Sequence, residues 1–261
     1  MPCRRRAFIA PLALLLGLTL VSLGGCTYDE DGPPDAHFEK FATKPPNYDT
    51  ATVCHAYGCK AQTRFTFTES DITELRALMA GVPRSDTPAE ERRALAYTIA
   101  WMERRVAPTV GTASDRTSID LRGSGDPSQL DCVDEATNTT SYLLVLDRHG
   151  LIKHHAVERP LAKDSLTRWT HWAAVIREKE SGERFAIDSG TGPNGENPTM
   201  QAAASFYVPD SYADNAPPER GLATAEVTSE APAQDPGALT RMLERMQALG
   251  FAPDATGSAS R

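Results

Sequence analysis

The apolar residues of this chain change their spacing once, close to Gly150. Before Gly150 they recur every three or four residues, which is typical of helices with one buried face. After Gly150 they alternate with polar residues, which is typical of strands. Helices followed by antiparallel strands predict an α+β fold, with N-terminal helices packed on an antiparallel sheet.

Capping residues set the expected bounds of the helices. Thr87 followed by Pro88 matches the start of a helix, and Asp131 is a residue type that caps helix N-termini. Gly81 and Gly150 are expected to end helices. The helices are expected at 68–81, 87–106 and 131–150. The strands are expected at 152–157, 171–177 and 184–188, the last two as a hairpin.

The first 26 residues have the pattern of an export signal. Three arginines precede an apolar stretch that polar residues and a proline interrupt, which suits a cleaved signal better than a permanent membrane span. The stretch ends in Leu23-Gly24-Gly25-Cys26, which resembles a lipobox. The resemblance implies a signal peptide at 1–25 and a lipid on Cys26, which anchors the protein in the cell envelope. Thr27 favours the outer membrane by the same analogy, and an uncleaved anchor is the alternative.

Proline-rich and polar segments flank one predicted folded unit. Residues 26–50 are expected to form a flexible tether, and residues 51–212 to form the folded domain. Residues 213–261 are expected to be a mostly disordered tail with one short amphipathic helix at 236–249.

The charge of the chain argues against nucleic acid as a partner. The formal net charge is −8, and removal of the three signal-peptide arginines takes it to −11. Binding to nucleic acid needs clustered lysine and arginine side chains that displace counterions, and no such cluster is present.

The cysteines divide into three groups. Cys3 would leave with the signal peptide and Cys26 would carry the lipid. Cys54 and Cys59 lie five residues apart in a glycine-containing segment and are expected to form a disulfide in an oxidising compartment. A metal site that includes His55 is the alternative. Cys132 is left over, either as a buried inert thiol or as a reactive one.

Cys132 is the candidate nucleophile because it would lie in the first turn of the third helix. Free backbone N–H groups and the helix dipole stabilise a thiolate there. Asp131 and Asp134 work against ionisation, since nearby carboxylates repel a negative sulfur. A reactive Cys132 therefore requires a histidine partner.

His171 and Asp188 are the candidate base and orienting carboxylate. If the hairpin loop comprises residues 179–182, Asp188 falls opposite Ala173 and shares a strand face with His171. An imidazole held by a carboxylate is the arrangement that thiol acyl transfer needs. Asp188 has an alternative role as a cap of the turn at 189–192. His154 and His155 alternate faces, so only one of them would reach such a site.

Cys132, Thr170-His171-Trp172-Ala173 and Asp188 together resemble the transglutaminase-like cysteine enzymes, over about residues 51–200. The segments 131–140 and 54–59 resemble an uncharacterised group of proteobacterial envelope proteins. The resemblance implies a papain-like core with Cys132, His171 and Asp188 as catalytic residues.

Some enzymes of this type depend on calcium, held by acids on both sides of the nucleophile. Asp131 and Asp134 match that pattern, but Val133 stands where those enzymes have an acid, so no metal or other cofactor is assigned. The backbone N–H of Cys132, with Gln129 or Trp101, is the candidate oxyanion site.

The sequence therefore predicts an envelope-anchored thiol acyl hydrolase, a peptidase or amidase, that acts on a protein, a peptide or a peptidoglycan stem. The alternative is a non-catalytic envelope scaffold that binds a peptide with the same fold.

Overall fold

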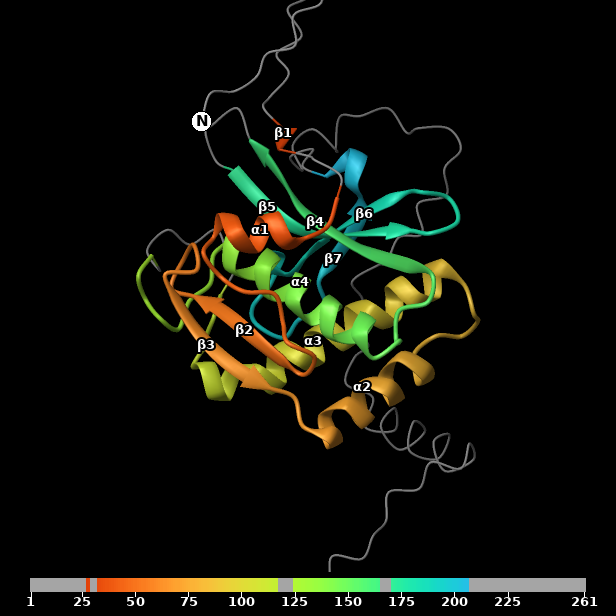
Figure 1. The fold of residues 1–261 in the computed structure, drawn as a ribbon, viewed down its shortest axis with the longest axis horizontal. Coiled ribbons are helices and arrows are strands. Elements are labelled where there is room, and N and C mark those ends of the chain that lie inside the picture. Colours follow the sequence, from red (N-terminus) through yellow and green to blue (C-terminus); the bar gives the residue numbers. More distant parts are fainter. Residues whose placement is uncertain (1–26, 29–31, 117–123, 165–169, 207–261) are drawn as a thin grey trace, which may run out of the picture.

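The structure is a computed structural model and describes residues 27–28, 32–116, 124–164 and 170–206. It is an α+β fold in which helices pack against antiparallel sheets, as the sequence predicted (Figure 1). The expected signal peptide, Cys26 and the amphipathic segment at 236–249 lie outside the described residues.

A five-stranded antiparallel sheet forms the larger layer, in the order β1-β4-β5-β6-β7. These strands are β1 (Thr27–Tyr28), β4 (His155–Asp164), β5 (Thr170–Glu178), β6 (Arg184–Asp188) and β7 (Thr199–Ala202). Two short 3-10 turns, η2 (Ser189–Thr191) and η3 (Ala203–Ser205), follow β6 and β7. A separate hairpin pairs β2 (Thr50–His55) with β3 (Ala61–Thr66).

The three long helices begin where the caps predicted them. They are α2 (Glu69–Gly81), α3 (Pro88–Val110) and α4 (Cys132–Arg148). Thr87 accepts the N–H of Glu90, and Pro88 occupies the first turn of α3. This helix continues past the expected end at Val106 because Gly111 is the residue that adopts the left-handed conformation and ends it, at φ 95°.

The N-terminal part of the domain differs from the prediction in two ways. The predicted tether at 26–50 contains a helix, α1 (Asp35–Lys40), and its Phe38 is 1 % exposed. The β2–β3 hairpin was not predicted, although Ala51 and Val53 alternate with more exposed residues and enter the core. Two buried rings, those of His37 and Phe38, attach α1 to the domain, and Nε2 of His37 lies 2.8 Å from Oγ1 of Thr137 in α4. Prolines and charges surround these residues in the sequence and concealed their burial.

β4 also differs from the expected strand at 152–157. It begins at His155 and continues to Asp164, with a shift in its pairing with β5 between Glu158 and Leu161. Pro160 lies within that shift, where a residue without an N–H group costs no ladder hydrogen bond. The proline therefore interrupts the pairing without ending the strand.

The main core lies around α4, which packs between the β2–β3 hairpin and the larger sheet. Leu143 and Leu146 of α4 join Ala174 and Ile176 of β5 in this core, together with residues of α2 and α3. Among the described residues, no helix combines the length and the apolar character that a membrane span requires.

Glu91 of α3 fixes the start of β4. Its buried carboxylate accepts the backbone N–H groups of Lys153 at 2.7 Å, His154 at 2.9 Å and His155 at 3.1 Å. It also lies 2.8 Å from the His155 ring nitrogen Nδ1. One side chain thus orders the chain between α4 and the sheet.

We expect Glu91→Ala to lower the free energy of unfolding by about 3 kcal/mol, because it leaves the buried N–H of His155 and the part-buried N–H groups of Lys153 and His154 without an acceptor. Urea denaturation measures this change. Glu39→Ala, which removes an exposed carboxylate from α1, is the control and should change the stability by less than about 0.5 kcal/mol. Equal effects of the two substitutions would contradict the role of Glu91.

Candidate active site

Cys132 is the first residue of α4, as predicted, and the helix start is doubly capped. The Asp131 side chain accepts the N–H groups of Val133 and Asp134, and the Asp134 side chain accepts the N–H of Asp131. The sequence predicted this helix start because Asp131 and Asp134 have the three-residue spacing of a capping box. The nucleophile candidate is thus held on a helix turn that two aspartate side chains cap.

The predicted hairpin register is confirmed. Ala174 pairs with Ile187, and Glu178 donates its N–H to Glu183, which leaves residues 179–182 as the loop. The same register places Asp188 opposite Ala173, two residues from His171 on the same face. The Nε2 atom of His171 lies 2.9 Å from Oδ2 of Asp188. The structure therefore brings the candidate base and the candidate orienting carboxylate together.

Asp188 combines the two roles that the sequence left as alternatives. Its Oδ1 atom accepts the N–H of Gly190 and caps η2, while Oδ2 faces His171. The carboxylate is 3 % exposed. Because the turn holds one oxygen, the other has a fixed direction toward the imidazole.

The sulfur of Cys132 lies at the edge of β5, beyond the end of its pairing with β6. Its Sγ atom donates to the carbonyl oxygen of Thr170 at 3.6 Å and accepts the N–H of Trp172. Glu178 directs its N–H toward β6, and alternate residues of a strand direct their backbone groups to the same side. The backbone groups of residues 170 and 172 therefore point to the side where β6 has already ended. Residues 170 and 172 therefore form hydrogen bonds with the Cys132 sulfur instead of with β6. His171 lies between these two residues in the chain.

The imidazole of His171 projects from the sheet face that α4 does not cover. Ala173 and Val175 of that face pack with Phe206, while Trp172 on the opposite face packs near Cys132. The ring of Phe206 stacks on the His171 ring with centroids 6.0 Å apart. His171 is thus held between an aromatic ring and a carboxylate, at the strand edge where the sulfur lies.

The thiol of Cys132 is held in its protonated form. Burial raises its pKa to about 12, the N–H of Trp172 opposes this rise, and the charges of Asp131 and Asp188 add to it. The sequence predicted the effect of Asp131, but the contribution of Asp188 follows from the fold. A stable thiolate at neutral pH is therefore not the resting state of this site.

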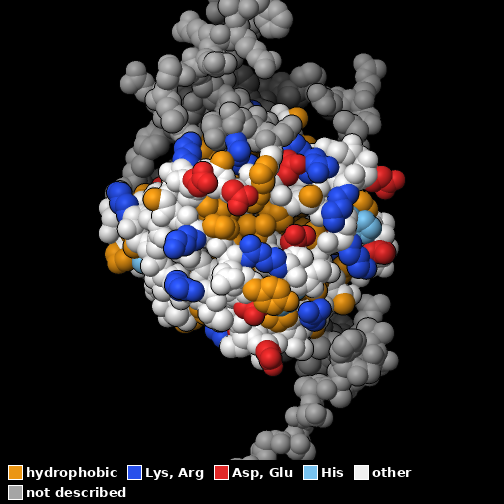
Figure 2. Space-filling view, in the orientation of Figure 1, with side chains coloured by type: hydrophobic (Ala, Val, Ile, Leu, Met, Phe, Trp, Pro, Cys, Tyr) orange, Lys and Arg blue, Asp and Glu red, His pale blue; other side chains and the backbone are white. Residues whose placement is uncertain are grey.

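Half-buried apolar side chains surround the thiol. Phe41 and Val133 pack with Cys132 around Ala136 and Trp172. The Nζ atom of Lys40 lies 4.4 Å from the centre of a Trp172 ring. Figure 2 shows hydrophobic side chains gathered near the middle of the face on which α1 lies, with lysine and arginine side chains around them.

Cys54 and Cys59 form a disulfide, as predicted. His55, the third member of the alternative metal site, lies 2.8 Å from the carbonyl oxygen of Pro127 and 3.1 Å from Oγ1 of Thr63. The metal alternative is wrong for this structure, because disulfide sulfurs are not thiolate ligands and both ring nitrogens of His55 have other partners.

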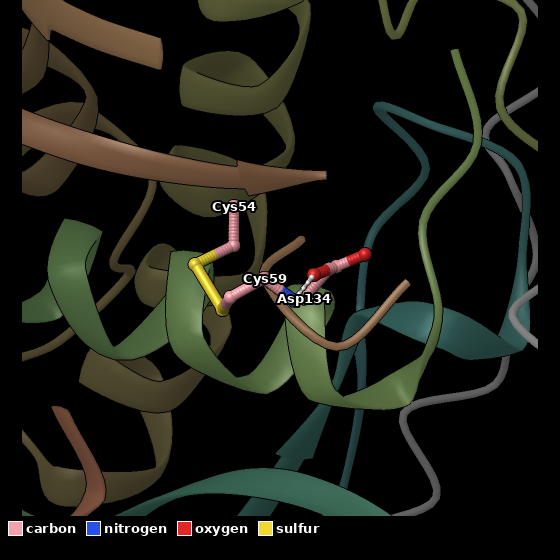
Figure 3. Close-up of side chains that lie close together, drawn as sticks. All are labelled: Cys54, Cys59 and Asp134. Carbon is pink, nitrogen blue, oxygen red and sulfur yellow. Dashed lines mark hydrogen bonds between the residues drawn. A yellow bond between two sulfur atoms is a disulfide. The ribbon is translucent and has the colours of Figure 1, made fainter. Parts of the chain in front are cut away.

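The acids beside the nucleophile bind backbone N–H groups instead of forming an open cation site. An oxygen of Asp134 lies within 4.8 Å of the two disulfide sulfurs, but the Asp134 oxygens accept the N–H groups of Tyr57 at 2.8 Å and Cys59 at 2.6 Å (Figure 3). Asp131 accepts the N–H of Gly58 at 3.0 Å. The two acids of the calcium pattern implied by the resemblance thus accept hydrogen bonds from the backbone of residues 57–59.

The other candidates for the site lie elsewhere. The side-chain amide of Gln129 donates to the carbonyl oxygen of Ser114, so it is not available in this structure as an oxyanion donor. Trp101 packs against the main core. His154 pairs with Asp86, and His155 lies between Glu91 and Arg92. None of these four is part of the His171–Asp188 corner.

Two surface pockets of about 380 and 260 Å³ also lie outside that corner. Residues such as Met79, Arg84 and Lys153 line the first, and residues such as Tyr48, Asp49 and His149 line the second. Neither brings together groups that suit acyl transfer.

A buried acidic cluster lies beneath the site, and the sequence patterns did not reveal it. Burial raises the pKa of Glu103 to about 7 and that of Asp115 to about 6. The pKa of Glu135 lies well above its usual value, first because of burial and then because of the charges of Glu103 and Asp115. Glu135 also shares a hydrogen bond with Asp115, so one of the two carries a proton.

Comparison of the chain with protein-family models, curated proteins and solved structures found no match. The geometry described above is therefore the basis for assigning a function.

The acidic cluster makes stability depend on pH in a defined direction. A carboxyl group whose pKa is raised by folding keeps its proton in the folded state, while the unfolded chain has released it. Stability is then lost as pH rises through the folded-state pKa values of about 6 to 7. We expect the free energy of unfolding to fall by about 1 kcal/mol or more between about pH 6.5 and pH 8.

Glu135→Gln should reduce this loss and stabilise the protein at about pH 8, because the amide is neutral and can still donate to Asp115. Urea denaturation at both pH values measures the effect, with Glu180→Gln in the exposed hairpin turn as the control. A Glu135→Gln protein with the same pH dependence as the native one would show that Glu135 is ionised in the fold.

Proposed function

We propose that this protein is a thiol acyl hydrolase, a peptidase or amidase, with Cys132 as nucleophile, His171 as base and Asp188 as orienting carboxylate. The observation that carries the proposal is the 2.9 Å contact between His171 and Asp188 at the strand edge where the Cys132 sulfur lies. A helix with the nucleophile at its first residue, packed on antiparallel strands that carry the histidine and the aspartate, also agrees with a papain-like, transglutaminase-like core.

In the proposed reaction, Sγ of Cys132 attacks the carbonyl carbon of the substrate and its proton passes to Nδ1 of His171. Asp188 holds the Nε2–H side of the ring and stabilises the imidazolium. Cys132 is the first residue of α4, so its N–H is not used by the helix ladder. This N–H faces the Cys132 sulfur and is the candidate donor to the developing oxyanion. The imidazolium then protonates the leaving amine, the C–N bond breaks, and water hydrolyses the thioester to restore the thiol.

The high pKa of the thiol requires that proton transfer accompany the attack. Asp131 and Asp188 disfavour a free thiolate, so the imidazole removes the proton as the carbon–sulfur bond forms. No cofactor is needed for this chemistry. Hydrolysis is favoured over crosslinking because water is the abundant acceptor in the envelope.

We place the enzyme in the cell envelope, lipid-anchored through Cys26 and facing the periplasm from the outer membrane. The export pattern of residues 1–26 supports this location. The Cys54–Cys59 disulfide agrees with an oxidising compartment. The substrate would be a protein loop, a peptide or a peptidoglycan stem, and the acidic charge of the chain argues against nucleic acid.

A non-catalytic scaffold is the second candidate, and one observation favours it. The sulfur is bonded to the backbone of β5, and its pKa of about 12 is that of an unreactive buried thiol. On this alternative, the apolar surface around Phe41 and Val133 would bind a peptide without cleaving it.

We expect His171→Ala to slow alkylation of Cys132 by iodoacetamide by about tenfold or more at neutral pH, because the base that removes the thiol proton is lost. The modified cysteine is quantified by mass spectrometry on the tryptic peptide 123–148, in which Cys132 is the only cysteine. His154→Ala is the matched control, since His154 also pairs with an aspartate but lies outside the site. Equal rates in the native and His171→Ala proteins would favour the scaffold.

Cys132→Ser should cause an intact substrate to accumulate in the cell envelope. Because serine is a much weaker nucleophile without the thiol, the substrate remains uncleaved while the protein still folds and reaches its location. Quantitative proteomics of envelope fractions from cells with the native or the Cys132→Ser protein detects the change. Identical fragment patterns in the two fractions would argue against a peptidase.

A further inference from the structure

The segment between Cys54 and Cys59 adopts an unusual backbone conformation. Four consecutive residues, 56–59, have positive φ angles between 57° and 72°, and only one of them is glycine. Residues with a Cβ atom rarely adopt this left-handed conformation, so the surrounding structure must hold it. The disulfide joins the two ends of this segment, which we call the disulfide loop.

The conformation of the disulfide loop turns three consecutive N–H groups toward the start of α4. Tyr57 and Cys59 donate to Asp134, and Gly58 donates to Asp131, at distances of 2.6 to 3.0 Å. Figure 3 shows Asp134 beside the disulfide at the first turn of the helix. Successive N–H groups in such a turn form a concave site for negative charge. Here the bound groups are the two carboxyl groups on either side of Cys132. Burial and the charge of Asp131 raise the pKa of Asp134 to about 7, and the N–H groups of Cys59 and Tyr57 oppose that rise.

A second attachment fixes the loop one helical turn further along α4. The side chain of Asn138 accepts the N–H of Cys54 at 2.7 Å and donates to the carbonyl oxygen of Cys54 at 2.9 Å. The loop is therefore bonded to α4 from Asp131 to Asn138, and Cys132 lies within this span. Breaking either the disulfide or the Asn138 pair would weaken its hold on the helix.

We infer that the disulfide loop is a charge-compensating clamp on the nucleophile: its N–H groups offset the negative potential of Asp131 and Asp134 at the sulfur, so that Cys132 can react between two acids. Asp131, Asp134 and Asn138 are then positioning residues, and the proton transfer they support rests on the proposed function. The clamp gives the disulfide a role in reactivity beyond that of a stabilising cross-link.

Other charged groups also face the thiol. Asp188 disfavours its ionisation from the end of β6. His171 is adjacent on β5, Lys40 lies over Trp172 from α1, and Glu135 follows in the same turn of α4. The clamp variants described below leave all four unchanged, so a change in reactivity reports on Asp131 and Asp134.

The test measures iodoacetamide alkylation of Cys132 against pH in the full chain, with and without the clamp. The Cys54→Ser/Cys59→Ser protein removes the disulfide, and Asn138→Ala releases the loop with the disulfide intact. Asp131→Asn is combined with each, because asparagine keeps the capping oxygen but lacks the charge. The tryptic peptide 123–148 reports on Cys132 alone, and circular dichroism verifies folding.

Each released variant should alkylate about threefold or more slowly at about pH 8, with its pH profile moved to higher pH. Asp131→Asn should restore most of the rate in these variants and change it less in the native protein. An unchanged rate would overturn the inference. A slower rate that Asp131→Asn does not restore would also overturn it, because the loop would then act by packing alone. If the Cys54→Ser/Cys59→Ser protein does not fold, the comparison of Asn138→Ala with Asn138→Ala/Asp131→Asn decides the question.

The result for His171→Ala separates this inference from the proposed function. A normal rate in His171→Ala together with slow released variants would refute the catalytic proposal and leave the clamp intact. Slow alkylation of Cys132 in His171→Ala, together with a normal rate in the released variants, would refute the clamp and support the catalytic proposal.

Discussion

The first turn of α4 is the point on which the rest of the candidate site depends. Asp131 and Asp134 cap the helix through reciprocal hydrogen bonds, and the same two carboxylates bind the disulfide loop. Cys132 lies between them and reaches the edge of β5. The helix cap, the disulfide loop and the edge of β5 thus all help to fix the position of Cys132.

This arrangement places negative charge near a thiol, which disfavours ionisation of the thiol. Burial raises the pKa of Cys132 most, and the charges of Asp131 and Asp188 add to this rise. The buried cluster of Glu103, Asp115 and Glu135 lies beneath the site. A site of this kind does not keep a thiolate at rest. It is suited to a nucleophile that ionises only when the imidazole removes its proton during attack, which limits side reactions of the thiol with oxidants.

Local rules predicted the parts of the site that depend on local geometry. The cap at Asp131 placed Cys132 at the start of its helix, and a four-residue loop placed His171 and Asp188 on one strand face. Both predictions need only the spacing of neighbouring residues. The disulfide could also be predicted, because five residues and a glycine separate its two cysteines.

The parts that remained unpredicted depend on contacts between distant segments. The buried acids come from α3, α4 and the loop between them, and no periodic pattern marks residues that meet only in the fold. The attachment of α1 depends on His37 and Phe38, which lie within a segment of prolines and charges. The clamp required the φ angles of residues 56–59, which no sequence rule predicts for a run with one glycine.

The most direct measurement is a crystal structure of the protein after reaction with a peptide that carries an electrophilic carbonyl. The account predicts a covalent bond from the carbonyl carbon to Sγ of Cys132, with Nδ1 of His171 within about 4 Å of the sulfur and Nε2 still on Asp188. An unmodified Cys132, or an adduct in which Nδ1 of His171 lies well beyond about 4 Å from the sulfur, would contradict it.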